Sequence, residues 1–199
     1  MWAAMTLDDV LARGRKTTVR RKRSGDAADE YRWRSDRDLA EFDASRPVQI
    51  PFDNYLRNWL FDFRYTDMPT RSFAIEDEEG RHIGNVMYYN FDQSRGDAEI
   101  GISIGERSYW ENGYGTDALR ALVKALFADG KLRRLYLHTL DWNMRAQRAF
   151  QKTGFQECGI SWRDGRTFVV MEIWREQAGA RVPVTAGGQV SLGAVTPLV

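Results

Sequence analysis

The sequence has one cysteine and only two histidines, and both scarcities exclude classes of protein. Cys158 cannot form a disulfide within the chain, which excludes a disulfide scaffold and favours a reducing, cytoplasmic setting. We expect Cys158 to be a small buried apolar side chain, since no histidine lies near it in the sequence. His82 and His138 belong to no Cys/His cluster with metal-ligand spacing, so no metal is predicted.

An excess of charge of one sign and long apolar runs are also lacking. The formal net charge is +1, and no run approaches the roughly 18 apolar residues of a membrane span. The four basic residues from Arg20 to Arg23 are one short run, and strand alternation would place them on both sides of a strand. We interpret that run as a solvated edge, and predict neither a nucleic acid nor a membrane as a partner.

What is present is one domain's length of mixed sequence. A chain of 199 residues is long enough to bury a sizeable core without metal or disulfide staples. We divide it into an N-terminal helical extension over 1–15, a folded domain over 16–176 and a low-complexity C-terminal tail over 177–199. The extension is interpreted as an amphipathic helix, because acids at Asp8 and Asp9 interrupt its apolar residues.

Periodicity along the domain alternates between the two regular structures. Strands are predicted over 17–23, 72–77, 82–91, 98–105, 133–140, 156–162 and 166–174, and helices over 26–35, 36–42, 51–65, 113–127 and 143–153. Tyr55, Trp59 and Phe63 recur at helical spacing, which we interpret as a stripe facing the core. The order predicts a mixed α/β (α+β) single domain. Its central, mostly antiparallel sheet would have a βαβα core and flanking helices.

Two neighbouring segments carry the predicted chemistry. In the strand over 98–105, Glu99, Gly101 and Ser103 share one face, which predicts that this face lines a cavity. The segment from Trp110 to Thr116 then joins this strand to a helix through two glycines. Backbone amides that converge at a helix N-terminus suit a pyrophosphate.

These segments, together with NMRAQRAFQKTGF at 143–155 and the closing hairpin, resemble the GNAT superfamily of N-acetyltransferases. The resemblance runs from about Lys16 to Glu176, and is narrower still to the branch that acetylates the N-termini of ribosomal proteins (RimJ/RimL-like). It implies a GNAT-like fold and a direct transfer of acetyl from acetyl-CoA, as cosubstrate, to a primary amine. The acceptor would be a protein N-terminus or a small molecule such as a polyamine or an antibiotic.

The resemblance also implies residues for the cofactor. Backbone amides from Glu111 to Thr116 would hold the pyrophosphate, the strand edge from Ile102 to Ile104 would pair with the pantetheine arm, and Asn143 would contact the cofactor or fix its pocket. Trp110 either covers the cofactor or packs under the loop, and Arg148 is the candidate for the 3′-phosphate. The predicted cofactor residues are Ile102, Ser103, Ile104, Trp110, Glu111, Asn112, Gly113, Tyr114, Gly115, Thr116, Asn143 and Arg148.

Catalytic candidates are fewer. Glu99 is the first choice for the general base, directly or through a water, and its alternative is a carboxylate at the rim of a hairpin. The family's tyrosine acid is replaced by Phe150, which leaves Ser103, Ser108, Tyr109 or water to protonate the departing thiolate.

Acceptor recognition is assigned to aromatic side chains in the variable parts, namely Tyr31, Trp33, Tyr88 and Tyr89. A second class of function is a non-catalytic module that binds acyl-CoA, which the loss of the tyrosine at Phe150 keeps open. The closing hairpin or the tail is the candidate contact for a homodimer.

Overall fold

The computed structural model describes residues 10–64, 71–128 and 130–179 of the chain. The strands are β1 (Val10–Arg13), β2 (Thr18–Arg21), β3 (Arg71–Glu76), β4 (His82–Asp92), β5 (Asp97–Ile104), β6 (Arg134–Leu140), β7 (Gln156–Arg163) and β8 (Arg166–Trp174). The helices are α1 (Asp26–Ser35), α2 (Arg37–Phe42), α3 (Phe52–Arg64), α4 (Tyr114–Ala128), α5 (Met144–Thr153) and α6 (Arg175–Gly179), with a 3-10 turn η1 (Arg107–Tyr109).

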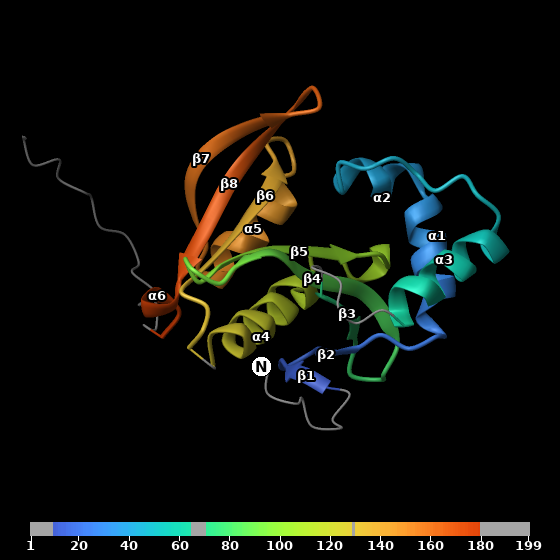
Figure 1. Cartoon of the computed structure of the whole chain (residues 1–199), viewed down its shortest axis with the longest axis horizontal. Helices are drawn as coiled ribbons and strands as arrows, with labels where there is room; N and C mark the ends of the chain where they lie inside the picture. The colour runs from blue at the N-terminus through green and yellow to red at the C-terminus, as the bar shows by residue number, and fades with distance from the viewer. Residues whose placement is uncertain (1–9, 65–70, 129, 180–199) are drawn as a thin grey trace, which may run out of the picture.

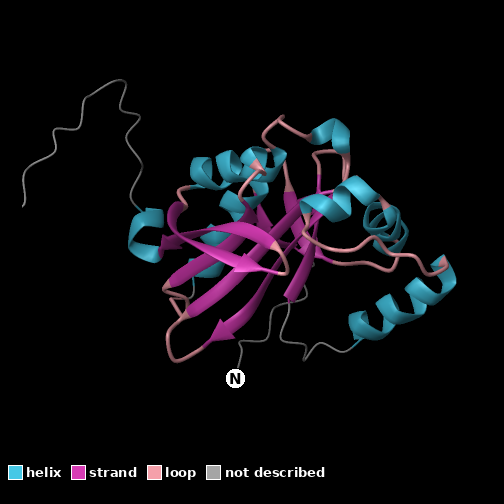
Figure 2. Ribbon diagram, turned by 90° about the horizontal axis from the view of Figure 1, so that it is seen from above, coloured by secondary structure: helices cyan, strands magenta, loops and turns pink. Residues whose placement is uncertain are grey.

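The strands form one twisted sheet in the order β1-β2-β3-β4-β5-β6-β8-β7 (Figure 2). Neighbouring strands are antiparallel except for β5 and β6, which are parallel. This architecture confirms the predicted mixed α/β domain with a mostly antiparallel sheet. Helices α1, α2 and α3 gather at one end of the molecule, and the β7–β8 hairpin stands at the other (Figure 1).

The parallel pair β5–β6 is short, and this matters for function. Its paired residues are Asp97 with Arg134, Ala98 with Leu135, and Glu99 with Tyr136. Beyond Glu99, β5 keeps its pairing with β4 as far as Ile104, while β6 continues alongside β8. The two strands therefore separate and open the middle of the sheet, as Figure 1 shows.

The main core lies between the sheet and the helices α4 and α5. Helix α4 buries Leu119 and Leu122 completely, against Ile100 of β5 and Leu135 of β6. Helix α5 ends at Gly154, whose φ of +107° is the left-handed conformation that glycine adopts without strain. A second, smaller cluster joins α1 to α3 through Ala27, Tyr55 and Trp59. The predicted core-facing stripe is thus confirmed at Tyr55 and Trp59, whereas the side chain of Phe63 lies outside the described part.

Two predictions about the N-terminal residues are wrong. Residues 10–13 form a strand rather than the end of a helix, because Leu11 and Ala12 pack against the main core while the backbone pairs with β2. Residues 1–9 lie outside the described residues. The basic run is not a solvated edge, since β2 lies between β1 and β3, and Arg20 is 3% exposed. Its guanidinium contacts Asp26 at 2.7 Å and Glu76 at 2.5 Å.

The prediction for Cys158 is also wrong, because this side chain is exposed. It stands on β7, the last strand of the sheet, where the register with β8 shifts between Glu157 and Gly159. Every residue of β7 except Ser161 is exposed, so neither face of this edge strand is covered by another layer.

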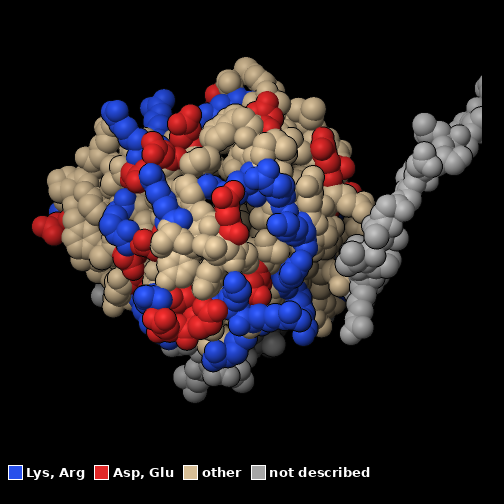
Figure 3. Space-filling model, turned by 180° about the vertical axis from the view of Figure 1, so that it is seen from behind, with Lys and Arg blue, Asp and Glu red and all other residues tan. Residues whose placement is uncertain are grey.

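The surface carries charges of both signs. Figure 3 shows the face opposite to that of Figure 1. Basic side chains gather there in a curved band on one half, with acidic side chains beside and within it. No helix in the described ranges is long and apolar enough to cross a membrane. Among the same residues, no group of three or more histidine, cysteine or acidic side chains is placed to hold a metal ion.

Candidate active site

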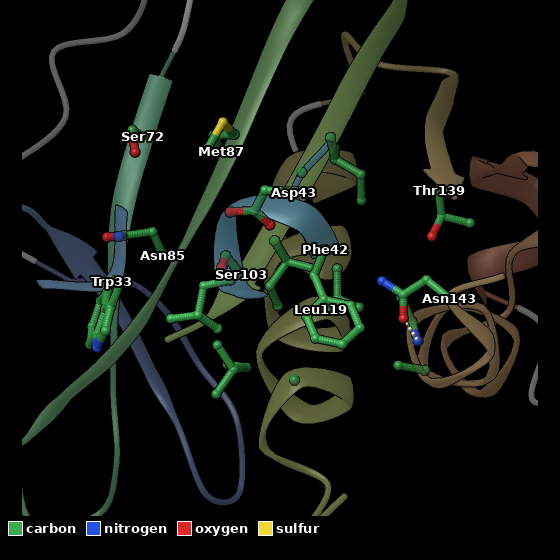
Figure 4. Close-up of a pocket in the computed structure, with 18 of the residues that line it drawn as sticks. Trp33, Phe42, Asp43, Ser72, Asn85, Met87, Ser103, Leu119, Thr139 and Asn143 are labelled. Atoms are coloured by element: carbon green, nitrogen blue, oxygen red, sulfur yellow. Dashed lines mark hydrogen bonds between the residues drawn. The ribbon is translucent and has the colours of Figure 1, made fainter. Parts of the chain in front are cut away.

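A large open cavity occupies the place where β5 and β6 separate. Its volume is about 1450 Å³, and its walls come from β4, β5, β6, the start of α4, the side of α5 and the α1–α2 segment. Figure 4 shows Ser103 on one side of the opening and Thr139 with Asn143 on the other. A cavity at the point where the strand order changes direction is a common place for a ligand in an α/β sheet.

The β5 wall provides a strand edge. Ile102, Ser103 and Ile104, which the sequence analysis predicts as cofactor residues, line the cavity. Because no β6 residue pairs with them, their edge is open to a ligand with amide groups, which would bind as an added strand does. At the end of this edge, the indole Nε1–H of Trp110 donates to the carbonyl oxygen of Ile104 at 2.7 Å. Trp110 thus packs under the loop and also forms part of the cavity wall.

The loop before α4 contains the predicted anion site. Glu111 and Gly113 have φ values of +62° and +85°, which turn the chain sharply just before α4 begins at Tyr114. Gly113, Gly115 and Thr116 line the cavity at the N-terminus of α4, where free amides and the helix dipole favour an anion.

The side chains of two predicted loop residues are engaged elsewhere. The Asn112 amide donates to the Ser108 carbonyl at 3.1 Å, and the Tyr114 hydroxyl donates to Glu78 at 3.1 Å. Neither Asn112 nor Tyr114 is among the residues that line the cavity. Their contribution to a ligand would come from the backbone, as the prediction for this loop stated.

The α5 wall supplies one cap and several cations. Asn143 is 7% exposed, and its side-chain oxygen accepts a hydrogen bond from the Ala146 amide at 3.2 Å, which fixes the start of α5. Arg148 is exposed and stands 3.9 Å from Glu111 across the mouth. Arg145 lies 3.5 Å from the centroid of the Trp110 ring, and burial lowers the pKa of its guanidinium. Arg145, Arg148 and Lys152 all line the cavity.

Glu99 lies behind the cavity wall rather than on it. The side chain is 5% exposed, and Glu99 is not among the residues lining the cavity. Its Oε2 accepts from the Asn90 amide at 2.9 Å, and its Oε1 lies 2.7 Å from Nδ1 of His138, which does line the cavity. This geometry gives Glu99 no direct route to a bound amine.

The proton positions of His138 follow from its two partners. Nε2 lies 2.7 Å from Nη2 of Arg163, and a guanidinium can only donate. Nε2 is therefore the acceptor, and Nδ1 carries the proton that it donates to Glu99. Burial and the charge of Glu99 raise the pKa of the neighbouring Tyr89.

Three of the four predicted acceptor residues line the cavity: Trp33, Tyr88 and Tyr89. Tyr31 does not, because its ring packs on Phe52 and its hydroxyl donates to the Ile50 carbonyl at 3.0 Å. Phe150 lies on the inner wall, 5% exposed, with its ring against Phe155.

Asp43 is a cavity residue that is not among the predicted site residues. This residue follows α2, lines the cavity and faces Ser103 (Figure 4). Burial raises the pKa of the Asp43 carboxyl to about 6, while a hydrogen bond with Ser103 and the charge of Arg34 act in the opposite direction. Asp43 is an exposed residue, so water in the open cavity reaches its carboxylate. No periodic pattern in the sequence marks an aspartate just after a six-residue helix as a cavity residue.

Comparisons with known proteins agree with this geometry. Residues 16–156 match the family model described as an acetyltransferase (GNAT) domain. A probable spermine N(1)-acetyltransferase of Bacillus subtilis subsp. natto (strain BEST195) is 30% identical over 100 residues, which are 48% of this chain and 66% of that relative.

Solved structures share the fold. The aminoglycoside acetyltransferase AAC(6′)-Ib with coenzyme A superposes with a TM-score of 0.68 at 22% identity, covering 81% of this chain and 96% of that one. The spermidine N-acetyltransferase of Vibrio cholerae with CoA and spermine gives a TM-score of 0.70 at 21% identity, covering 81% and 97%.

Proposed function

Because this chain belongs to the GNAT acetyltransferase family, we propose that it transfers the acetyl group of acetyl-CoA to the amine of a small polar molecule. The observation that carries the proposal is the cavity between β5 and β6, which joins an unpaired strand edge to the N-terminus of α4. Acetyl-CoA is an extended molecule. Its thioester arm needs the open strand edge, and its pyrophosphate needs the helix N-terminus next to that edge.

The residues present fit acetyl-CoA. The open edge from Ile102 to Ile104 suits the amides of the pantetheine arm. The amides of Gly113, Gly115 and Thr116 suit the pyrophosphate, and the three cations of α5 at the mouth suit the remaining phosphate. Acetyl-CoA supplies the acetyl group as a thioester. An N–H of the open β5 edge would stabilise the negative charge that develops on the thioester oxygen.

The side chains around this edge hold it in place. Trp110 donates a hydrogen bond to the Ile104 carbonyl, and Asn143 fixes the start of α5 on the far side of the opening. Glu99 fixes the ring of His138, which lines the wall. Phe150 has no proton to give, so we assign protonation of the leaving thiolate to Ser103 or to water.

The charges on the acceptor side of the cavity favour a small amine with other polar groups over an amine that carries positive charges alone. Its charged lining residues are Arg21, Lys22, Glu30, Arg34, Asp43, Asp62 and Arg71. The lining is thus mixed in sign, and Lys22 already pairs with Glu30 at 2.7 Å. Such a wall suits an amine that also carries hydroxyl or anionic groups. The named relatives, a spermine and an aminoglycoside acetyltransferase, also point to small amines rather than to ribosomal proteins.

Calorimetric titration of acetyl-CoA tests the cofactor site. Gly115 has an ordinary helical conformation, and a side chain there would meet Ile104 and enter the cavity. We expect micromolar binding to the wild type and to the control Gly25→Trp, where a side chain meets open space, and loss of binding in Gly115→Trp. Equal binding by all three proteins would contradict this placement.

Thiol release with a panel of acceptors tests the reaction. The panel contains amino acids, an aminoglycoside, spermine, spermidine and short peptides with free N-termini. We expect release with at least one small polar amine and less with the peptides. Acetyl-CoA binding without thiol release on any acceptor would instead favour the non-catalytic module.

A further inference from the structure

We propose that Asp43 is the catalytic base, the group that binds the acceptor's ammonium and removes its proton before attack. This inference rests on the proposed acetyltransferase function and deepens it. It assigns the base to the segment after α2 rather than to the β5 residue Glu99.

The position of Asp43 is the first argument. Figure 4 shows its carboxylate inside the cavity, directed at Ser103 of β5. Ser103 belongs to the strand edge along which we place the thioester arm. An amine held between Asp43 and Ser103 would therefore lie beside the thioester, on the side of the cavity formed by α1, α2 and α3.

Helix α2, which precedes Asp43, is held in place by contacts at both of its ends. At its start, Asp36 accepts hydrogen bonds from the amides of Asp38 and Leu39, and its carboxylate also pairs with Arg107 at 2.8 Å. At its end, the Phe42 ring packs against Trp110 and against Trp142, with centroid distances of 5.6 and 5.4 Å. Asp43 comes directly after this anchored ring, so its place over β5 is fixed by the fold.

Third, the two acids near the reaction site differ in what their oxygens are free to do. Both Glu99 oxygens are engaged, one with His138 and one with Asn90, and the side chain is sealed from the cavity. Ser103 and Arg34 are the groups that act to lower the pKa of Asp43, and Asp43 forms no ion pair among the described residues. An acid with a spare oxygen in the cavity can accept a proton from a ligand, whereas a saturated one behind the wall cannot.

Acids and bases both line this cavity. Its charged and titratable groups besides Asp43 are Arg21, Lys22, Glu30, Arg34, Asp62, Arg71, Tyr88, Tyr89, Tyr109, Glu111, His138, Arg145, Arg148 and Lys152. Arg145 of α5 lies 4.6 Å from the ring centroid of Phe42, the residue before Asp43. Partial removal from water raises the pKa of Asp43 to about 6, close to neutral, where a general base is most effective.

The amine loses two protons during the transfer, and Asp43 takes the first. The ammonium gives one proton to Asp43, and the nitrogen lone pair then bonds to the thioester carbonyl carbon. The C–S bond breaks with its electron pair on sulfur, and the nitrogen loses its second proton, which ends on the thiolate. Asp43 returns its proton to water, leaving an amide and free CoA thiol.

The test compares Asp43→Asn with Glu41→Gln, an exposed acid on α2 outside this cavity. We expect Asp43→Asn to lower kcat/KM by about 100-fold or more while acetyl-CoA binding stays unchanged, because a positioned base contributes roughly that factor. Asp43→Glu should recover part of the loss, and Glu41→Gln should match the wild type. The acidic limb of the wild-type kcat/KM profile, near pH 6, should be absent in Asp43→Asn.

The contrary results are distinct. If Asp43→Asn keeps the wild-type rate and acidic limb, or if Glu99→Gln removes that limb instead, the assignment to Asp43 is wrong and the acetyltransferase proposal stands. If the wild type itself releases no thiol with any amine, the proposed function fails, and the assignment falls with it.

Discussion

Asp26 and Asp43 both belong to the α1–α2 segment, but their surroundings are opposite. Asp26 at the start of α1 is buried with two oxygens on Arg20 and a third contact from the Arg23 amide at 2.7 Å. Burial acts to raise the pKa of Asp26, and the bonds from Arg20 and Arg23 bring it below its usual value. Asp43 forms no ion pair within the described part of the chain, and burial raises its pKa. Paired acids of this kind stabilise the fold, while the unpaired one is available for chemistry.

The largest effect should come from breaking the paired cluster. Arg20→Met removes the buried guanidinium that contacts both Asp26 and Glu76, and leaves Glu76 with Arg23 alone. Removing one partner of a buried ion pair typically costs about 3–5 kcal/mol of the free energy of unfolding. Arg21→Met changes an exposed side chain on the same strand and should stay within about 0.5 kcal/mol. Urea unfolding of both variants measures the difference. Similar values for the two would show that the buried cluster adds nothing.

Substitutions at the pair of His138 and Glu99 should lower the free energy of unfolding by less than Arg20→Met does. His138→Phe removes the donor to the buried Oε1 of Glu99, and an unsatisfied buried acceptor costs about 1–3 kcal/mol. Arg163→Ala, which frees only the outer nitrogen of His138, should cost less than His138→Phe. Urea unfolding at pH 7 compares them. A larger loss in Arg163→Ala would mean that Glu99 does not depend on the histidine.

Asp77 gives a pH-dependent version of the same test. It accepts hydrogen bonds from the Glu79 amide, from the amide and Nε of Arg81, and from the Tyr109 hydroxyl. Burial opposes these bonds, yet together they lower the pKa of Asp77 to about 2. We expect Asp77→Asn to lose about 1–2 kcal/mol of stability at neutral pH.

The sign of this dependence is fixed by linkage. A lowered pKa in the folded state stabilises the protein above the unfolded value of about 3.9 and is lost as pH falls toward about 2. The difference in free energy of unfolding between wild type and Asp77→Asn should therefore become smaller as the pH falls over that range. Urea unfolding at several pH values measures this stability difference. A difference that stays constant with pH would contradict the assignment.

The smallest effect, and the only one of opposite sign, is expected for Asp43→Asn. A raised pKa in the folded state means that wild-type stability falls as pH rises from about 4 to about 6. The variant should be more stable than the wild type at pH 7, by at most about 1 kcal/mol because water screens the carboxylate, and equal to it below pH 4. Thermal unfolding at the two pH values decides, and a loss of stability at pH 7 would make Asp43 a structural residue.

Much of the fold and of the cofactor side is readable in the sequence. Alternation in β5 places Glu99 and Ser103 on one face, and glycines mark the turn before α4 and the end of α5. These signals are local, so a single sequence carries them. The prediction of cofactor residues on β5 and at the start of α4 follows from them.

The failures concern partners distant in sequence. Arg20 looks solvated within its basic run, because Glu76, which helps to neutralise it, lies 56 residues away. Residues 10–13 fit a helical pattern, and only pairing with β2 makes them a strand. Glu99 shares the face of Ser103 as predicted, but the sequence does not show that His138 would stand in front of it.

The most direct measurement is the titration of the Asp43 carboxyl itself, followed by NMR on protein with 13C-labelled aspartate. Asp43→Asn identifies the resonance, and Asp26 provides the internal comparison. We predict a midpoint near 6 for Asp43 and one below the usual aspartate value for Asp26. A midpoint for Asp43 near 4, the value of a fully hydrated aspartate, would contradict the claim that an unpaired acid is held in the cavity for proton transfer.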